Sequence, residues 1–221
     1  MSKILRSYFR RFEARQRFFA GLQGTCRVLD LGCGPGDNGV ALKELHPDID
    51  IHGVDLLPAG AVRDFYSYRV VDLDRGVLPY PDGYFDAVLF THVIEHLRSP
   101  LQLGKEINRV MKQGALIYVE TPNWTTAFVP SFGFHREQHN PFNFYDDPTH
   151  VKPWTKHGLF EFLYQSCNVN VIKTRTRRNF LRLPFDIPIF LLGLLTGNRS
   201  YTVTSFWNLY GWCIYAVGAK R

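Results

Sequence analysis

The residues best suited to chemistry are two acids and a run of glycines, each placed where an apolar segment ends. Asp30 closes such a segment, and a turn with three glycines follows it, at Gly32, Gly34 and Gly36. Glycines there let backbone amides approach a ligand at the start of a helix. Asp55 ends the next apolar segment, where its carboxylate is placed to accept hydrogen bonds from two ribose hydroxyls. The pattern predicts a nucleotide site, and a glycine-rich turn without a ligand is the alternative.

Histidines and carboxylates further along the chain raise the question of a metal site. His135 and His139 lie four residues apart, with Asp146, Asp147 and His150 downstream. Mg²⁺ prefers carboxylates to imidazoles, and Zn²⁺ sites have tighter ligand spacing. We therefore predict no metal ligands.

These residues need strands and helices to position them, and the chain alternates the two from residue 26 onward. Apolar runs predict strands at 27–31, 51–54, 69–71, 85–90, 115–120, 170–174 and 212–217. Helical spacing or flanking stop signals predict helices at 38–45, 100–111 and 155–165. Such alternation predicts an α/β fold, with a doubly wound parallel sheet, helices on both faces and ligand sites at the carboxyl ends of the strands.

The length and composition of the chain limit the classes of protein to which it can belong. The 221 residues are 45% hydrophobic and 21% charged, which fits one domain with its own core and excludes a disordered tail. Four cysteines lie far apart without zinc-ligand spacing, which favours a reducing compartment. The apolar stretch 187–195 is shorter than the ~20 residues of a bilayer span, and no export leader is recognisable. We expect a cytoplasmic protein, with peripheral membrane contact left open.

The net charge of +6 is carried by the two ends of the chain. Residues 1–27 hold seven basic side chains against one acid, and residues 173–221 hold eight against one, whereas the middle is acidic. A nucleic-acid binder more often spreads positive charge over its main face. We interpret the ends as local docking elements and expect no nucleic-acid partner.

The glycine turn and the runs that follow it resemble the class I S-adenosylmethionine-dependent methyltransferases. The resemblance rests on six runs in the family's order, at 30–36 (DLGCGPG), 54–55 (VD), 71–73 (VDL), 78–86 (LPYPDGYFD), 91–97 (THVIEHL) and 106–112 (EINRVMK). It covers residues 26–122 densely and resumes at 212–217. It implies a Rossmann-like doubly wound sheet of seven strands, with an antiparallel last strand beside the fifth.

The resemblance also implies S-adenosyl-L-methionine as cofactor and gives each site residue a role. Asp30 would hold the ammonium group of the methionine moiety, directly or through a water, Asp55 the ribose, and Asp72 the adenine amine. Two leucines would pack on the adenine, and the turn would contact the cofactor through its backbone. The cofactor-binding residues implied are Asp30, Gly32, Cys33, Gly34, Gly36, Asp55, Leu56, Asp72 and Leu73.

Three histidines are candidates for activating the methyl acceptor. His92 and His96 follow the fourth strand; the family's equivalent of His96 packs against the sheet end, whereas His92 is either structural or catalytic. His150 lies in the run 144–155, which is similar to the "Y-D-P-T-H-V-r-p-f-T" segment of methyltransferases associated with cell-surface polysaccharide and sugar modification. A neutral imidazole oriented by an Asp could take a proton from a sugar hydroxyl. We predict His150 and His92 as catalytic residues, with capping of the next helix as the alternative for His150.

Two further segments frame the predicted domain. Residues 1–25 are predicted to form a basic amphipathic helix, and residues 26–221 the methyltransferase domain, with a lid-like insert at 123–154 and an apolar insert at 179–200. One face of the helix carries Leu5, Tyr8, Phe9, Phe12 and Phe19. The helix and the apolar insert suit an anionic membrane surface. Packing on the domain is the alternative for the helix, and a homodimer contact or a wall of the substrate pocket for the insert.

The residues together predict a methyltransferase acting on an oxygen, or second a nitrogen, of a sugar, glycolipid precursor or related small metabolite. One alternative is an NAD(P)-binding Rossmann oxidoreductase, which would want the glycine spacing GxGxxG instead of the observed GxGxG. The other is a non-catalytic membrane-associated protein that retains the fold.

Overall fold

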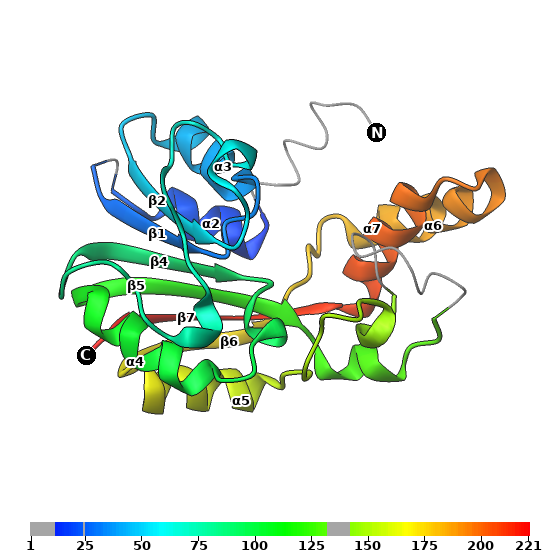
Figure 1. Ribbon diagram of the computed structural model, residues 1–221. Helices are drawn as coiled ribbons and strands as arrows, with labels where there is room; N and C mark the ends of the chain where they lie inside the picture. Colours follow the sequence, from blue (N-terminus) through cyan, green and yellow to red (C-terminus); the bar gives the residue numbers. More distant parts are fainter. Residues whose placement is uncertain (1–11, 24, 132–141) are drawn as a thin grey trace.

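The computed structural model describes residues 12–23, 25–131 and 142–221, built around one seven-stranded sheet (Figure 1). The strand order is β3-β2-β1-β4-β5-β7-β6. Neighbours from β3 to β5 pair in parallel, and β7 is antiparallel to both β5 and β6. The predicted doubly wound sheet with an antiparallel last strand is confirmed. The strands are β1 Arg27–Leu31, β2 Asp50–Asp55, β3 Ser67–Val70, β4 Phe85–Thr91, β5 Met111–Pro122, β6 Val169–Thr176 and β7 Cys213–Lys220.

Helices cover both faces of the sheet, as expected (Figure 1). One face buries Phe19 and Leu42 from α2 and α3 beside Tyr118 of the sheet. The other face buries Ile107 of α4 and Leu159 of α5. The helices are α2 Ala14–Ala20, α3 Asp37–Leu45, α4 Pro100–Val110, α5 Lys156–Glu161, α6 Leu183–Thr196 and α7 Arg199–Tyr210.

Local sequence explains where helices α4 and α5 begin and which face they bury. Pro100 stands in the first turn of α4, where the missing N–H costs nothing. Leu103, Ile107 and Val110 follow at helical spacing and are all fully buried. The helix predicted at 155–165 is α5 continued by a π-helical turn, η6 Phe162–Ser166.

The two ends of the insert 123–154 lie next to each other. Asn123 and Trp154 form a parallel bridge, and the Trp124 N–H donates to the Trp154 carbonyl at 3.0 Å. Phe142 and Phe144 are buried within the insert's second half. The loop is therefore anchored at both ends, and His135 and His139 lie outside the described residues.

The apolar insert 179–200 and the residues after it form a helical hairpin, α6 and α7, between β6 and β7. Pro188 lies inside α6 and removes only one hydrogen bond near the start of the helix. The Asn198 side chain accepts the Tyr201 N–H at 3.2 Å and so caps α7. Helix α7 was not predicted, because its β-branched and aromatic residues have low helix propensity.

The part of segment 1–25 that the structure describes packs on the sheet. Phe18 and Phe19 of α2 are buried, and the Phe18 ring lies 5.4 Å from that of Tyr118. For this end of the segment, packing on the domain is the correct alternative. Leu5, Tyr8 and Phe9 lie outside the described residues. Within the described ranges, no helix combines the length and apolar content needed to cross a bilayer.

Candidate active site

A cavity of about 480 Å³ opens where β1, β2 and β4 end. Another cavity, of about 450 Å³, lies at the opposite end of the sheet and contains none of the predicted site residues. In open α/β sheets, ligands bind at the carboxyl ends of the strands, which singles out the first cavity. Seven of the predicted residues line it: Gly32, Gly34, Asp55, Leu56, Asp72, Leu73 and His92.

The backbone angles and close contacts of the glycine turn require glycine. Gly32 has a φ of 66°, and a Cβ there would lie 2.2 Å from a Val93 methyl. Gly34 has a φ of 53°, yet a Cβ there would meet no protein atom within 4 Å. Only glycine takes such angles readily, and the open space at Gly34 belongs to the cavity. The turn therefore leaves room for a ligand beside the backbone.

Asp55 is fixed by the same turn. One carboxylate oxygen accepts the Gly34 N–H at 2.8 Å, and the other accepts the Leu57 N–H at 3.2 Å. A carboxylate oxygen has two acceptor positions, so each retains one for a ligand in the cavity. This geometry suits a pair of neighbouring hydroxyl groups, as predicted from the sequence.

Two leucines and a second acid line the same cavity. Leu56 is mostly exposed and Leu73 is buried, so between them they offer an apolar surface to a flat ring. One oxygen of Asp72 accepts the Asp74 N–H at 3.1 Å, and the other lies 3.3 Å from the Arg75 guanidinium. The Asp72 carboxylate is thus held in place while still bordering the cavity.

Asp30, Cys33 and Gly36 do not line the cavity, unlike the other predicted cofactor residues. Asp30 is fully buried and accepts hydrogen bonds from Tyr66 Oη at 2.9 Å and Asn38 Nδ2 at 3.1 Å. Burial raises the pKa of Asp30 to about 6. These contacts tie the turn to α3 and to the loop that precedes β3. The hydrogen bond from Tyr66 was not predicted, because Tyr66 is 36 residues away in the chain. The role of Asp30 toward the ammonium group of the cofactor stays a prediction.

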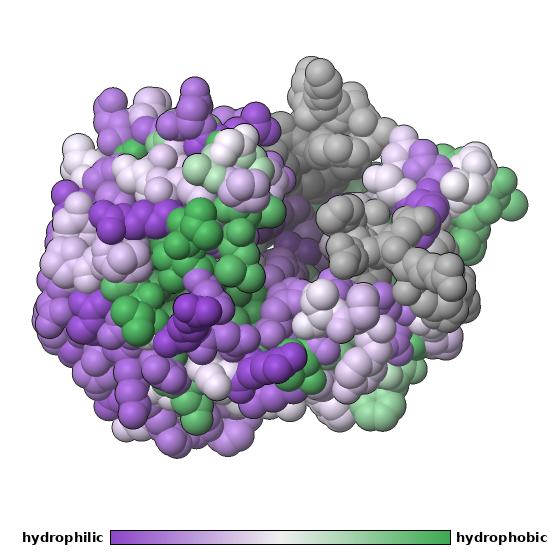
Figure 2. Space-filling model, viewed as in Figure 1, coloured by the Kyte–Doolittle hydropathy of each residue, from purple (hydrophilic) through white to green (hydrophobic). Residues whose placement is uncertain are grey.

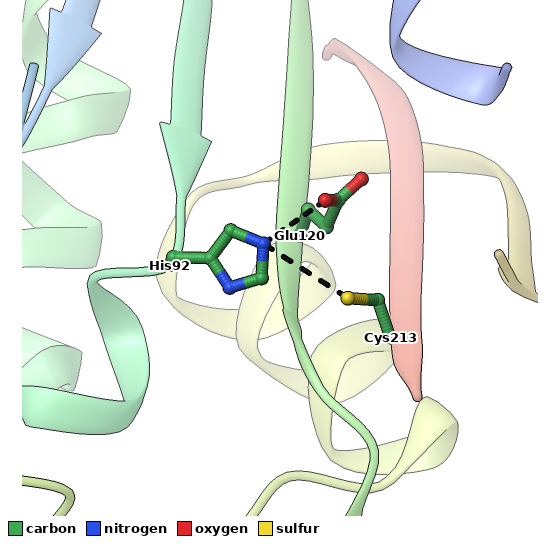
Figure 3. Close-up of side chains that lie close together, drawn as sticks. All are labelled: His92, Glu120 and Cys213. Atoms are coloured by element: carbon green, nitrogen blue, oxygen red, sulfur yellow. Dashed lines mark hydrogen bonds and ion pairs between the residues drawn. The ribbon is translucent and has the colours of Figure 1, made fainter. Parts of the chain in front are cut away.

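His92 lies in a buried network at the edge of the cavity (Figure 3). Its φ of 56° is uncommon for a non-glycine residue. The Nε2 atom lies 3.1 Å from Glu120 and 3.9 Å from Cys213 Sγ, and Nδ1 lies 3.4 Å from Glu95. Burial opposes a charged imidazole, but Cys213 and the two carboxylates outweigh it and raise the pKa of His92 well above 6.5. These neighbours therefore favour the protonated form of His92.

Glu120 is the centre of this network. Its Oε1 also forms an ion pair with Arg177 at 3.0 Å, and its Oε2 accepts from Tyr118 Oη at 2.5 Å. Burial alone would favour the neutral acid, yet Arg177 and His92 hold the pKa of Glu120 far below its ordinary value. None of Glu120, Arg177 and Tyr118 was singled out from the sequence, because no local motif marks them.

His150 occupies a different environment. It is buried, stacks on the Phe144 ring at 4.4 Å and donates from Nδ1 to the Phe144 carbonyl at 2.5 Å. Burial lowers the pKa of His150 below 6.5, so the ring is neutral and Nε2 carries the lone pair. That atom lies 4.0 Å from Asp147. His150 does not line the cavity, although its neighbour Thr149 does.

Two contacts around His150 refine the sequence interpretation. The Thr155 side chain, not His150, caps α5 by accepting the Gly158 N–H at 2.9 Å, so the capping alternative is wrong. The Thr149 hydroxyl donates to Asp147 at 2.6 Å and therefore accepts from His96 Nδ1 at 2.9 Å. His96, predicted as structural, also lines the cavity.

Two groups of residues in the described ranges have metal-ligand side chains close together. They are His92, Glu120 and Cys213, and Glu95, His96 and His150. In the first, Arg177 already supplies a cation 3.0 Å from Glu120. In the second, Glu95 Oε1 faces His92, and Glu95 Oε2 accepts from Thr121. In both groups a carboxylate therefore already has a partner within the protein.

Comparison with known proteins gives consistent results. The family described as "Methyltransferase domain" matches residues 4–171. Ajmaline N-methyltransferase of Rauvolfia serpentina is 35% identical over 104 residues, which are 42% of this chain and 34% of that protein. Malonyl-[acyl-carrier protein] O-methyltransferase of Legionella pneumophila is 36% identical over 99 residues, 42% of this chain and 35% of that protein. The chain thus spans only about a third of the length of these relatives.

A solved structure shows the same fold over nearly the whole chain. A SAM-dependent methyltransferase from Archaeoglobus fulgidus superposes with a TM-score of 0.59 at 23% identity, covering 99% of this chain and 94% of that one. At this identity the likeness shows the architecture alone.

Proposed function

Because the chain belongs to the methyltransferase domain family, we propose that it is an S-adenosylmethionine-dependent methyltransferase. The observation that carries this proposal is the Asp55 carboxylate, fixed by the Gly34 N–H at the rim of the cavity with acceptor positions to spare. The rival assignment, an NAD(P)-dependent oxidoreductase, is not favoured by the family or by the GxGxG spacing of the turn.

We assign the following roles toward the cofactor. Asp55 accepts hydrogen bonds from the ribose hydroxyls, and Asp72 accepts one from the adenine amine. Leu56 and Leu73 pack on the adenine ring, and the backbone at Gly32 and Gly34 lies against the ligand. When bound, S-adenosylmethionine supplies a methyl group on a sulfonium that needs no further activation. The protein's task is therefore to align the acceptor and exclude water.

The acceptor that we propose is an oxygen, or second a nitrogen, of a sugar, glycolipid precursor or related metabolite. Support comes from the run 144–155 and from Thr149 and His96, which lie beside His92 on the cavity wall. The two relatives named above carry N- and O-methyltransferase names and match just under half of this chain. We infer that the acceptor is set by segments beyond the cofactor residues, such as 123–154 and the hairpin before β7.

We assign the proton chemistry to two histidines with different roles. His150 is neutral with its lone pair on Nε2, and we propose it as the base. Because it does not line the cavity, the proton would reach it through an intervening group on the cavity wall. The neighbours of His92 favour its protonated form, which suits it to orienting or stabilising an acceptor oxygen.

The cofactor assignment is tested by calorimetry with S-adenosylhomocysteine. Asp55→Ala removes a charged acceptor of hydrogen bonds, so binding should weaken by about 1.5–3 kcal/mol, roughly 10- to 150-fold. Asp48→Ala is the matched control, since Asp48 is an exposed acid on the turn before β2 and does not line the cavity. Tight NADH binding without a response to S-adenosylhomocysteine would overturn the assignment.

A further inference from the structure

Helix α6 exposes a continuous apolar surface. Six of its large apolar side chains are exposed, and Leu195 reaches 86%. Figure 2 shows hydrophobic residues gathered at the hairpin's outer end, where Figure 1 places α6. The exposed side chains are Phe185, Ile187, Leu191, Leu192, Leu194 and Leu195. A water-soluble surface rarely gathers so many apolar side chains without a partner.

The exposed side chains occupy one half of the helix. At 3.6 residues per turn, the arc from Leu194 through Leu195 to Phe185 spans about 180° and holds no charged side chain. The opposite half packs on α7, where a Cβ on Gly193 would lie 2.5 Å from the Thr202 hydroxyl. Helix α7 thus supports α6 from behind and leaves its apolar half facing outward.

The size of this surface argues against a second protein copy as its partner. A helix of 14 residues is about 21 Å long and about 10 Å wide, so its outer half offers roughly 300 Å². Stable protein interfaces take about 800 Å² from each partner. A single apolar helix face of this size can instead be buried in the interface of a bilayer, where lipid chains surround the side chains.

The charge around the hairpin favours an anionic surface. The only acid in residues 173–221 is Asp186, which is buried and paired with Arg182 at 2.7 Å. No exposed carboxylate of this segment therefore opposes a negative surface. Arg178 lies before α6 with an exposed side chain, and a basic group close to anionic headgroups is attracted to them.

We propose that the α6–α7 hairpin docks the protein on an anionic lipid surface. Helix α6 lies in the plane of the interface with its apolar half among the acyl chains, and α7 remains on the watery side. At about 21 Å, α6 is shorter than the ~30 Å hydrocarbon core and does not span it. The hairpin follows β6 at the sheet end where β4 and β5 also finish, so docking would turn the cavity's end of the sheet toward the lipid.

The test is co-sedimentation with vesicles of phosphatidylcholine alone or with 30% phosphatidylglycerol. The protein should pellet with the anionic vesicles at low salt and be largely released at ~0.5 M salt, where screening shortens to a few ångströms. The double substitution Leu191→Ser, Leu195→Ser should lower the partition coefficient at least tenfold. The matched control is Val77→Ser with Leu101→Ser, since both residues are similarly exposed but lie outside the hairpin.

Further measurements distinguish docking on lipid from misfolding and from self-association. Thermal unfolding and S-adenosylhomocysteine binding should be unchanged in both double variants, because the replaced side chains are exposed and do not line the cavity. Hydrogen exchange on adding anionic vesicles should slow in 183–196. Absence of vesicle binding, or equal loss in the control variant, overturns the proposal. So does a wild-type dimer that Leu191→Ser, Leu195→Ser converts to monomers, which would make α6 a contact between two copies.

Discussion

Two histidines near the cavity are driven in opposite directions by their surroundings. His92 lies among Glu120, Glu95 and Cys213, and its pKa is raised. His150 is stacked on Phe144, where burial outweighs the opposing effect of Glu95 and Asp147, and its pKa is lowered. A catalytic base must be unprotonated at the working pH, so the two candidates require different pH dependence.

We predict the pH profile of a His150 base. The rate constant kcat/KM should rise with pH through an apparent pKa below 6.5 and stay level through neutral pH. A His92 base would instead keep the rate rising well above pH 6.5. His150→Ala should lower turnover by about 10²–10⁴ without changing affinity for S-adenosylhomocysteine.

The control for this series is His157→Ala, since His157 is an exposed histidine on α5 outside the cavity. Its turnover should match that of the wild type. If His150→Ala retains full turnover while His92→Ala abolishes it, the base is His92. If both retain activity, the acceptor needs no base from the protein.

At the residue scale, the sequence predicted those site residues that lie in short local motifs. Gly32, Gly34 and Asp55 were found because a strand, a turn and a strand end mark them, and all three line the cavity. The network around Glu120 was missed because its partners come from distant parts of the chain, such as Cys213 on β7. Asp30 was placed at the right turn, but the hydrogen bond that it accepts from Tyr66 has no sequence signal.

At the element scale, the strands were predictable and the helical hairpin was not. Apolar runs flanked by turn residues identified every strand to within a few residues, most directly β1, β4 and the centre of β5, which are buried and apolar almost throughout. The run 183–196 is apolar on all sides, so no periodicity identified it as a helix. Helix α7 depends on packing against α6, which only the tertiary structure provides.

Because α6 packs closely on α7 at Gly193, substituting Gly193 by alanine tests that packing. Glycine to alanine in a helix usually stabilises by about 0.5–1 kcal/mol. At Gly193 the new Cβ would lie 2.7 Å from the Thr202 backbone nitrogen, so we expect a loss of about 1–3 kcal/mol instead. Urea unfolding and hydrogen exchange in 183–196 measure it.

Gly60→Ala serves as the comparison, since a Cβ there meets nothing within 4 Å. It should cost nothing measurable. A stabilised Gly193→Ala variant would mean that α6 does not pack closely on α7.

At the scale of the whole molecule, buried Asp30 makes stability depend on pH. Its pKa is about 6 in the folded chain against 3.8 for an ordinary aspartate, so the folded state binds the proton more tightly between these values. Stability from this group is therefore greatest at acid pH and is lost as pH rises from about 4 to about 6. The shift corresponds to about 3 kcal/mol.

The measurement is urea unfolding of the wild type and of Asp30→Asn between pH 4.5 and 6.5. Subtracting the two curves removes contributions shared with other groups. The difference should show the wild type losing stability relative to Asp30→Asn as pH rises. A flat difference would mean that Asp30 titrates in the folded protein as it does when unfolded.

The position of β7 between β5 and β6 has a consequence for how the chain folds. Strands β1 to β5 can pair as they are synthesised, but β6 has no neighbour in the sheet until β7 has been made. β7 pairs with β5, and the pair Pro122 and Cys213 in this ladder is separated by 91 residues in the chain. Such distant pairings form slowly, since the intervening chain must be ordered first. Until then β6 remains unpaired, so we expect the last strand to set both the folding rate and the period of greatest exposure to aggregation.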